Sequence, residues 1–344
     1  MKRKSNVLMA VDLFSGCGGL TQGLKDAGFA VGAAVEIDTL AAETYAANHP
    51  DVKLFNADIR SISASEIMEA CSVVKGELDL LAGCPPCQGF SRIRLNNKKE
   101  RMDDPRNRLI DEVLRLIGEL QPKAVMLENV PNLARYTRYL NFKRELRKLG
   151  YDVVDKVLDV ADFGVPQRRK RLVVLASRLG QISHPAPVDK RKTVRDAIAT
   201  LPADIVHNDP LHNLGERRSE RVRQLIRAIP KDGGSRTALS TGLTLKCHEK
   251  KDGFYDVYGR MKWDDVSPTI TGGCINPSKG RFLHPTEDRA ITLREAALLQ
   301  SFPPNYVFSL RRGKYAAAEM IGNALPPVFS RMQAEVIRKH LRAR

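Results

Sequence analysis

The sequence predicts an α/β fold, a doubly wound and mostly parallel sheet with a second, smaller domain. Two observations carry this prediction. In the first half of the chain, short apolar runs alternate with helix-capable segments, and this alternation is typical of a parallel sheet with crossover helices. After about residue 180 the alternation stops, and prolines, histidines and dense charge replace it until about residue 290.

The apolar runs of the first half are the expected strands, and helix-capable segments lie between most of them. In chain order we expect strands at Val7–Phe14, Ala30–Asp38, Lys53–Asp58, Leu78–Gly83, Ala124–Val130, Tyr151–Val160 and Leu172–Ala176. Helices are expected at Leu20–Ala27, Thr39–Asn48, Ser63–Ala70, Arg106–Leu120 and Leu140–Leu149, the last three with apolar residues at three- and four-residue spacing. Near the end, capping signals predict a helix at Thr292–Gln300, and an apolar face of Val328, Met332 and Val336 predicts one at Val328–Arg342.

Composition narrows the class of partner. The chain has 344 residues, of which 42% are hydrophobic, enough for a sizeable core. Lysine and arginine number 56 against 40 acidic residues, and the net charge of +16 favours a polyanion, nucleic acid rather than membrane. No run approaches the roughly 20 apolar residues of a membrane span, and residues 1–6 lead into a strand rather than a signal peptide, so we expect a cytoplasmic protein.

The six cysteines are scattered, and this pattern in a cytoplasmic protein argues against disulfides. Cys84 and Cys87 have the spacing of half a zinc site, but no second pair completes it, so we expect no metal. Cys87 stands after two prolines at the exit of a predicted strand, where it is a candidate nucleophile. An inert loop cysteine is the alternative. Cys84 is expected still within the strand as a packed, buried thiol.

A glycine-rich turn after the first strand indicates a ligand site. Gly16, Gly18 and Gly19 let the backbone approach a ligand closely before a helix begins, although a tight connection explains such a turn equally well. Glu36 and Asp58 end the second and third strands, where carboxylates accept hydrogen bonds from ribose hydroxyls and an adenine amine. Together these features predict an adenosine-containing cofactor.

Several motifs in this order resemble one family. They are Asp12–Leu20, Pro85–Gln88, Glu128–Val130, Gln167–Arg171 and Gly322–Pro327, and they resemble the DNA (cytosine-5)-methyltransferases of bacterial type. The resemblance runs from Val7 to Pro327. It implies the S-adenosylmethionine-dependent methyltransferase fold, S-adenosyl-L-methionine as cofactor and double-stranded DNA as substrate.

The resemblance also assigns cofactor contacts. It places Phe14 against the adenine, the glycines around the methionine part, Glu36 on the ribose and Asp58 with Ile59 at the adenine. The full set is Phe14, Gly16, Gly18, Gly19, Leu20, Glu36, Ile37, Asp58, Ile59, Pro85 and Asn323. Because the last motif normally folds back beside the first, we expect a catalytic domain of residues 1–180 completed by 291–344, and a target-recognition domain of 181–290.

Catalytic roles follow from the chemistry of cytosine, whose carbon 5 is a poor nucleophile until a thiolate adds at carbon 6. The resemblance gives that addition to Cys87. Glu128 would contact ring nitrogen 3 and the exocyclic amine as an acid that burial keeps protonated, unless it is only a helix cap or ion-pair partner. Arg171 would bind oxygen 2, and Arg169 would hold the nucleophile loop. By composition alone, these arginines are as well explained as a solvated basic strand edge.

DNA contacts are expected in two regions. A stacked base cannot reach a thiol, so the target cytosine must rotate out of the helix, and the basic segment Ser91–Pro105 suits a lid over it, or else an exposed connector. Base reading is expected within Leu201–Tyr258, where Arg236, Lys246, His248 and Lys250 fit phosphate contacts equally well. The expected DNA-binding residues are Gln88, Ser91, Arg92, Arg94, Arg106, Thr269 and Thr271.

The sequence therefore predicts a monomeric DNA cytosine-5 methyltransferase. An RNA (tRNA) cytosine-5 methyltransferase on the same scaffold is the alternative, and Gly89-Phe90-Ser91 favours the DNA branch. A catalytically silent relative would typically lack the nucleophile, the acid or an arginine, and all are present. The enzyme would serve a restriction-modification system, with an endonuclease acting on the same site without a stable complex, or stand alone as an orphan methylase.

Overall fold

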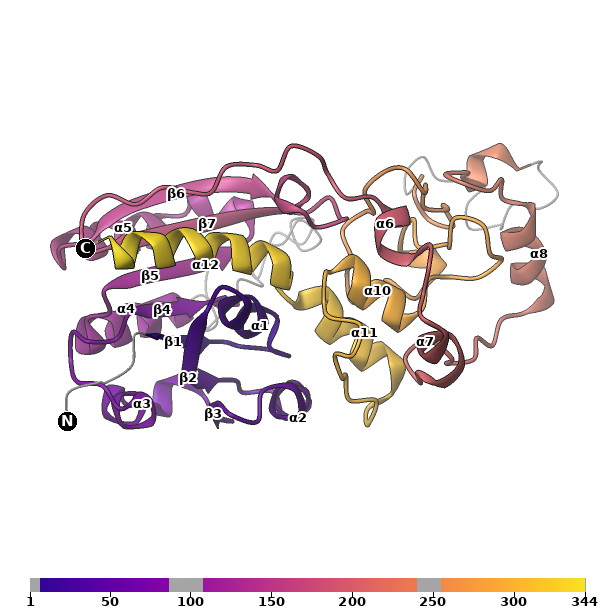
Figure 1. Ribbon diagram of the computed structural model, residues 1–344. Helices are drawn as coiled ribbons and strands as arrows, with labels where there is room; N and C mark the ends of the chain where they lie inside the picture. The colour runs from indigo at the N-terminus through magenta and orange to yellow at the C-terminus, as the bar shows by residue number, and fades with distance from the viewer. Residues whose placement is uncertain (1–6, 87–107, 240–254, 344) are drawn as a thin grey trace. The chain divides into compact units, whose positions relative to one another are not determined.

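The computed structural model describes residues 7–86, 108–239 and 255–343. Its backbone forms two compact units (Figure 1). The first comprises Met1–Val160, Lys170–Pro187 and Leu325–Arg344, and the second comprises Ala161–Arg169 and Val188–Ala324. The chain therefore returns to the first unit at Leu325, later than the predicted return at residue 291.

A seven-stranded sheet forms the first unit, in the order β3-β2-β1-β4-β5-β7-β6. Its strands are β1 (Leu8–Leu13), β2 (Phe29–Val35), β3 (Lys53–Phe55), β4 (Leu80–Gly83), β5 (Ala124–Asn129), β6 (Asp152–Asp159) and β7 (Lys170–Ser177). Neighbours among β1 to β5 pair in parallel, whereas β7 is antiparallel to both β5 and β6. The predicted doubly wound, mostly parallel sheet is thus confirmed.

The helices of the first unit follow the prediction closely. They are α1 (Gly19–Asp26), α2 (Thr39–Asn48), α3 (Ala64–Cys71), α4 (Leu109–Leu120), α5 (Thr137–Lys148) and α12 (Pro327–Arg342), with short 3-10 turns at Ile59–Ser61 and Pro131–Arg135. A further 3-10 turn, Val160–Phe163, begins at the last residue before the second unit. Ser63 begins α3 with a capping box to Glu66, and Asp38 caps α2 by accepting from Leu40 and Ala41. The main core is formed by alternate strand residues, such as Val11 and Leu13, with the apolar sides of α3, α4 and α5.

The first helix, α1, packs against the last, α12, which is the yellow helix of Figure 1. Gly23 makes this possible, because a Cβ there would lie 2.5 Å from the carbonyl oxygen of Pro327 and 2.7 Å from the nitrogen of Arg331. The Ser330 hydroxyl donates across the same contact to the Gly19 carbonyl, at 3.4 Å. The last helix of the chain therefore packs against the first helix, which follows the glycine-rich turn.

The second unit is built of short helices and loops. Its α-helices are α6 (Val194–Ile198), α7 (Ala203–Asn208), α8 (Glu220–Ala228), α10 (Leu293–Leu299) and α11 (Gly313–Asn323), with 3-10 turns at Arg236–Ala238 and Pro277–Lys279. The predicted cap of α10 is present as a box between Thr292 and Glu295. A small core of Leu225, Ile226, Ile229, Val257, Tyr258 and Leu283 packs one side of α8.

Arg260 organises this small core. Its side chain is fully buried, and its guanidinium donates to the carbonyls of Ile226 at 2.8 Å, Ile229 at 3.1 Å and His284 at 3.0 Å. It also pairs with the Asp288 carboxylate at 2.6 Å. A buried guanidinium is tolerated only when its donors are satisfied, so Arg260 ties the loop at His284 to α8.

Within the described residues, no helix is both long and apolar enough to cross a membrane.

Candidate cofactor and catalytic sites

The turn after β1 has an unusual backbone. Phe14 adopts a φ of 60°, Gly16 of 55° and Gly18 of 95°, and a non-glycine residue such as Phe14 takes this conformation only at a cost. A Cβ on Gly16 would meet nothing within 4 Å, so open space lies beside the turn. Gly18 precedes α1 and, as a glycine, has no side chain with which to cap the helix.

Glu36 joins this turn to the end of β2. Its Oε2 accepts from the Gly16 amide at 2.8 Å, and its Oε1 accepts from the Asp38 amide at 2.7 Å. Burial raises the pKa of Glu36, while these backbone donors oppose the shift. Each carboxylate oxygen keeps capacity for a second donor, so the carboxylate fits a ribose with two adjacent hydroxyls.

The other predicted cofactor residues lie on several elements of the two units. Asp58 caps the turn Ile59–Ser61 by accepting from the Arg60 amide at 3.0 Å. Ile59 points its side chain into the main core, so only its backbone is free to face a ligand, whereas Ile37 is exposed. Leu20 is buried in the first turn of α1, and Asn323 ends α11 in the second unit.

A buried polar network behind the turn was not predicted. Asp12 Oδ2 accepts from the Thr21 hydroxyl at 2.7 Å, and that hydroxyl lies 2.8 Å from the Tyr45 hydroxyl. Asp12 Oδ1 has no hydrogen-bond partner among the described residues. Burial, ahead of the charge of Glu36, raises the pKa of Asp12 to about 7. Only the fold shows this network, because the three side chains come from β1, α1 and α2.

Glu128 and Arg171 form an ion pair near the carboxyl end of β5. Arg171 Nε lies 2.6 Å from Glu128 Oε1, and the two side chains are 16% and 10% exposed. Glu128 stands in β5 and Arg171 in the antiparallel β7, and each alternates with residues of the main core. Both therefore project from the opposite face of the sheet, which brings these two predicted residues together.

Cys84 lies next to this pair. It follows the last residue of β4, rather than lying within the strand as predicted, and its amide donates to the Leu13 carbonyl at 3.2 Å. Burial raises the pKa of its thiol well above the ordinary value, helped by the negative charges of Glu128 and Asp12 and opposed by Arg171. The thiol therefore stays protonated at neutral pH, which disfavours it as a nucleophile.

The segment that leads to the proposed nucleophile is anchored here. Asn129 donates its side-chain amide to the Pro85 carbonyl at 2.9 Å. Cys87 itself lies outside the described residues, as do Gln88, Ser91, Arg92, Arg94 and Arg106 and the rest of the predicted lid.

Arg169 and the neighbouring Gln167 serve the second unit. The Arg169 guanidinium is buried and donates to the carbonyls of Ile270 at 3.2 Å and Gly322 at 2.7 Å. Gln167, which the sequence did not indicate, bonds the Gln300 side chain at 2.7 Å and accepts from the Ile270 amide at 2.8 Å. Arg169 thus holds the loop at Ile270 to the end of α11, where Asn323 lies.

The predicted DNA contacts of this loop differ in accessibility. The Thr269 hydroxyl is half-buried and donates to the Arg168 carbonyl at 2.7 Å, whereas Thr271 is exposed. Of the predicted base-reading candidates, Arg236 begins a 3-10 turn, and Lys246, His248 and Lys250 lie outside the described residues.

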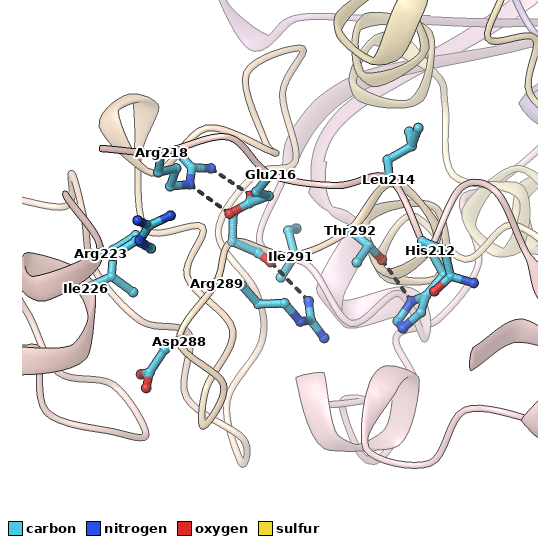
Figure 2. Close-up of a pocket in the computed structure, with 12 residues that line it drawn as sticks. His212, Leu214, Glu216, Arg218, Arg223, Ile226, Asp288, Arg289, Ile291 and Thr292 are labelled. Carbon is cyan, nitrogen blue, oxygen red and sulfur yellow. Dashed lines mark hydrogen bonds and ion pairs between the residues drawn. The ribbon is translucent and has the colours of Figure 1, made fainter. Parts of the chain in front are cut away.

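A separate pocket of about 420 Å³ lies in the second unit (Figure 2). Figure 2 shows Arg218 against Glu216 and His212 against Thr292, with bond lengths of 2.7 Å and 3.2 Å. Arg223 pairs with Glu220 at 2.7 Å outside the view. Arg289, also on its wall, pairs with Glu295 at 2.7 Å, so these arginines are neutralised by the protein's own carboxylates. Most of the lining falls within the predicted base-reading segment Leu201–Tyr258, but none of the base-reading candidates named there lines the pocket.

Comparison with known proteins places this geometry in a family. Residues 8–339 match the family model described as C-5 cytosine-specific DNA methylase. The chain is 36% identical over 345 residues to the Type II methylase M.HgiDII of Herpetosiphon aurantiacus, covering 96% of this chain and 95% of that protein. It is 34% identical to the Type II methyltransferase M1.HphI of Haemophilus parahaemolyticus, covering 96% and 87%.

Solved structures agree in fold. A candidate DNA modification methyltransferase encoded within an E. coli prophage superposes with a TM-score of 0.71 at 26% identity, covering 97% of this chain and 99% of that one. The S. pombe Dnmt2 methyltransferase superposes with a TM-score of 0.60 at 19% identity, covering 98% and 99%, a likeness of fold alone. The chain belongs to the C-5 cytosine-specific DNA methylase family.

Proposed function

We propose that the chain transfers a methyl group from S-adenosylmethionine to carbon 5 of a cytosine in duplex DNA, through a covalent bond between Cys87 and carbon 6. The observation that carries the proposal is the Glu128–Arg171 pair, 2.6 Å apart. The pair stands beside the Asn129–Pro85 hydrogen bond, which anchors the segment leading to Cys87.

The cofactor would lie along the turn after β1. Glu36 would accept the two ribose hydroxyls, the open side of Gly16 would admit the methionine part, and Asp58 would face the adenine. When bound, S-adenosylmethionine supplies an electrophilic methyl group. The chain's residues hold it at the carboxyl ends of β1 and β2, where the parallel sheet presents its ligand-binding edge.

The side chains at β5 and β7 would receive the cytosine. Arg171 would donate to oxygen 2, and Glu128 would pass a proton to ring nitrogen 3 and accept from the exocyclic amine, so that negative charge entering the ring is stabilised. With the ring held this way, the Cys87 thiolate adds to carbon 6, and carbon 5 becomes nucleophilic enough to take the methyl group. Water then takes the proton from carbon 5, and the electron pair of that C–H bond re-forms the carbon 5–carbon 6 double bond and expels the thiolate.

Duplex DNA is the proposed substrate, and the cytosine must leave the base stack to reach these groups. The net charge of +16 supports a polyanionic partner, and the relatives compared are Type II methyltransferases. We therefore favour duplex DNA over transfer RNA, and a role beside a restriction endonuclease of the same site over an orphan role. Bisulfite sequencing of DNA from expressing cells identifies the methylated site.

Transfer of a labelled methyl group distinguishes the substrates. We expect incorporation into duplex DNA and none into transfer RNA, and the reverse result would contradict the proposal. A duplex containing 5-fluorocytosine tests the nucleophile, because fluorine cannot leave as a proton does and the adduct persists. The wild type should form a denaturation-resistant adduct and Cys87→Ala should not, while Cys84→Ala should still form one.

A further inference from the structure

We propose that Cys84 is a positioning residue for Glu128, whose carboxyl group its thiol holds by donating a hydrogen bond. This inference rests on the proposed role of Glu128 in binding the cytosine. It assigns to Cys84 a part in catalysis other than that of the nucleophile.

The register of the sheet brings the two residues together. Gly83 of β4 is paired with Leu127 of β5, so the residues that follow, Cys84 and Glu128, stand side by side at the carboxyl ends of neighbouring strands. Leu127 belongs to the main core, and alternation turns Glu128 to the opposite face. Asp12, one strand further along, alternates with Val11 and Leu13 of the same core and shares that face.

The contacts of the thiol give it one role. The register sets it beside the Glu128 carboxyl group, and Glu128, Asp12 and Arg171 are the charged groups that act on it. Because burial and two carboxylates hold the sulfur in its protonated form, the thiol offers a donor and no negative charge. A carboxyl group beside it is therefore a natural acceptor.

Glu128 needs a second contact because its ion-pair partner, Arg171, is also the proposed donor to the base. Its Nε lies 2.6 Å from Glu128 Oε1, yet in the proposed mechanism the same guanidinium binds oxygen 2 of the base. Among the described residues, Glu128 Oε1 accepts no well-directed hydrogen bond, despite the short ion-pair distance. A second contact at Cys84 keeps the Glu128 carboxyl group in place while Arg171 engages the base.

Single-turnover methyl transfer to a duplex tests the proposal, with the dissociation constants of cofactor and DNA measured in parallel. Cys84→Ala and Cys84→Val both remove the donor, and valine nearly preserves the volume should alanine fail to fold. Both should slow transfer about fivefold, the worth of one neutral hydrogen bond, with both dissociation constants unchanged. Cys84→Ser keeps a donor and should restore the rate. Cys71→Ala, which removes a buried thiol from α3 in the main core, is the matched control and should leave the rate unchanged.

Combination with Glu128→Ala separates this inference from the proposed function. Glu128→Ala alone should slow transfer strongly, and adding Cys84→Val should then slow it no further, because no acceptor for the thiol remains. If the two losses instead multiply, or if Cys84→Ser is as slow as Cys84→Val, Cys84 does not position Glu128. If Glu128→Ala transfers at the wild-type rate, the proposed role of Glu128 itself is wrong.

Discussion

Glu36 connects the end of the second strand to the glycine-rich turn, because its carboxylate accepts a hydrogen bond from the Gly16 amide. Glu36→Ala removes the acceptor of the Gly16 and Asp38 amides together with the proposed ribose contacts. Hydrogen bonds to a charged group contribute about 1.5–3 kcal/mol each, so we expect the dissociation constant of S-adenosylmethionine to rise at least tenfold, and that of DNA much less. Calorimetry measures both. An unchanged cofactor affinity would show that the pocket lies elsewhere.

Asp12 gives the folded protein a pH dependence of known sign. An ordinary carboxyl group titrates near 3.8, but burial raises the pKa of Asp12 to about 7 in the folded state. The folded state therefore retains a proton that the unfolded state has lost, and this contribution to stability declines as pH rises toward 7. The charged groups nearest to Asp12 include Glu36, whose charge adds to the shift.

Asp12→Asn removes this titration. The difference in unfolding free energy between Asp12→Asn and the wild type should shift in favour of the variant by roughly 2–3 kcal/mol from pH 5 to pH 8. Burial lowers the pKa of His49 to about 4, which changes stability in the opposite direction, but His49 is present in both proteins and cancels. Urea unfolding at the two pH values measures the difference. A difference independent of pH would contradict the assignment.

Among individual residues, the sequence predicted those that belong to a recognisable motif. Glu36, Glu128 and Arg171 lie on strands or at their ends, so position along the chain predicted their place in the fold. The Asp12 network and the environment of Cys84 were not predictable, because they depend on which strands are neighbours. Cys84 was predicted to be packed and buried, whereas it is half-buried, and its place beside Glu128 was not predicted.

At the scale of elements, the contact between α1 and α12 is the most demanding. Gly23→Ala would place a methyl group against the backbone of Pro327 and Arg331, which cannot move without separating the two helices. We expect a loss of about 1–3 kcal/mol in stability, the usual cost of overpacking. Gly118→Ala in α4 is the matched control, because a Cβ there meets nothing within 4 Å, and better helix propensity should stabilise it by about 0.5–1 kcal/mol.

Thermal unfolding of the two variants measures both effects. Equal changes in the two proteins would mean that α1 and α12 do not pack as closely as the structure has them.

Strands and helices of the first unit were predicted to within a few residues, since apolar runs and helical spacing are local signals. The direction of one strand was not predicted, and in the second unit helices such as α8 were missed. β7 is antiparallel to β6, the strand that precedes it in the chain. A run of apolar residues in the sequence does not show in which direction a strand runs. The helix α8 was missed among dense charge, although Val222, Leu225, Ile226 and Ile229 have helical spacing and Ser219 precedes its first turn.

At the scale of the whole molecule, the order of the motifs predicted two domains, but the boundary depends on packing. Residues 291–324 belong to the second unit because α10 and α11 pack there, with Gln300 donating to the Ile321 carbonyl and Arg169 to that of Gly322. Motif order alone could not show this, because the last motif straddles the boundary between Ala324 and Leu325.

Sequence choice and chemistry should be separable at this scale. Replacing Leu201–Tyr258 with its counterpart from a family member of different specificity should move methylation to that relative's site, with transfer still supplied by Cys87, Glu128 and Arg171. Bisulfite sequencing of the modified DNA reads the outcome. A well-folded chimera that still marks the original site would place recognition in another segment.

The structure indicates how such a chimera folds. Arg260 lies outside the exchanged segment, but two of its acceptors, the carbonyls of Ile226 and Ile229, lie within it. Both acceptors are main-chain carbonyls, so they remain available to Arg260 whatever side chains the relative has. The exchanged segment must only form α8 in the same register and supply a buried residue that packs against Leu283. Arg260→Met should then destabilise wild type and chimera alike by about 1–3 kcal/mol for each carbonyl left unsatisfied, because the buried carbonyls of Ile226 and Ile229 lose their donor. If Arg260→Met lowers the stability of only one of the two proteins, the exchanged segment forms a core that does not depend on Arg260.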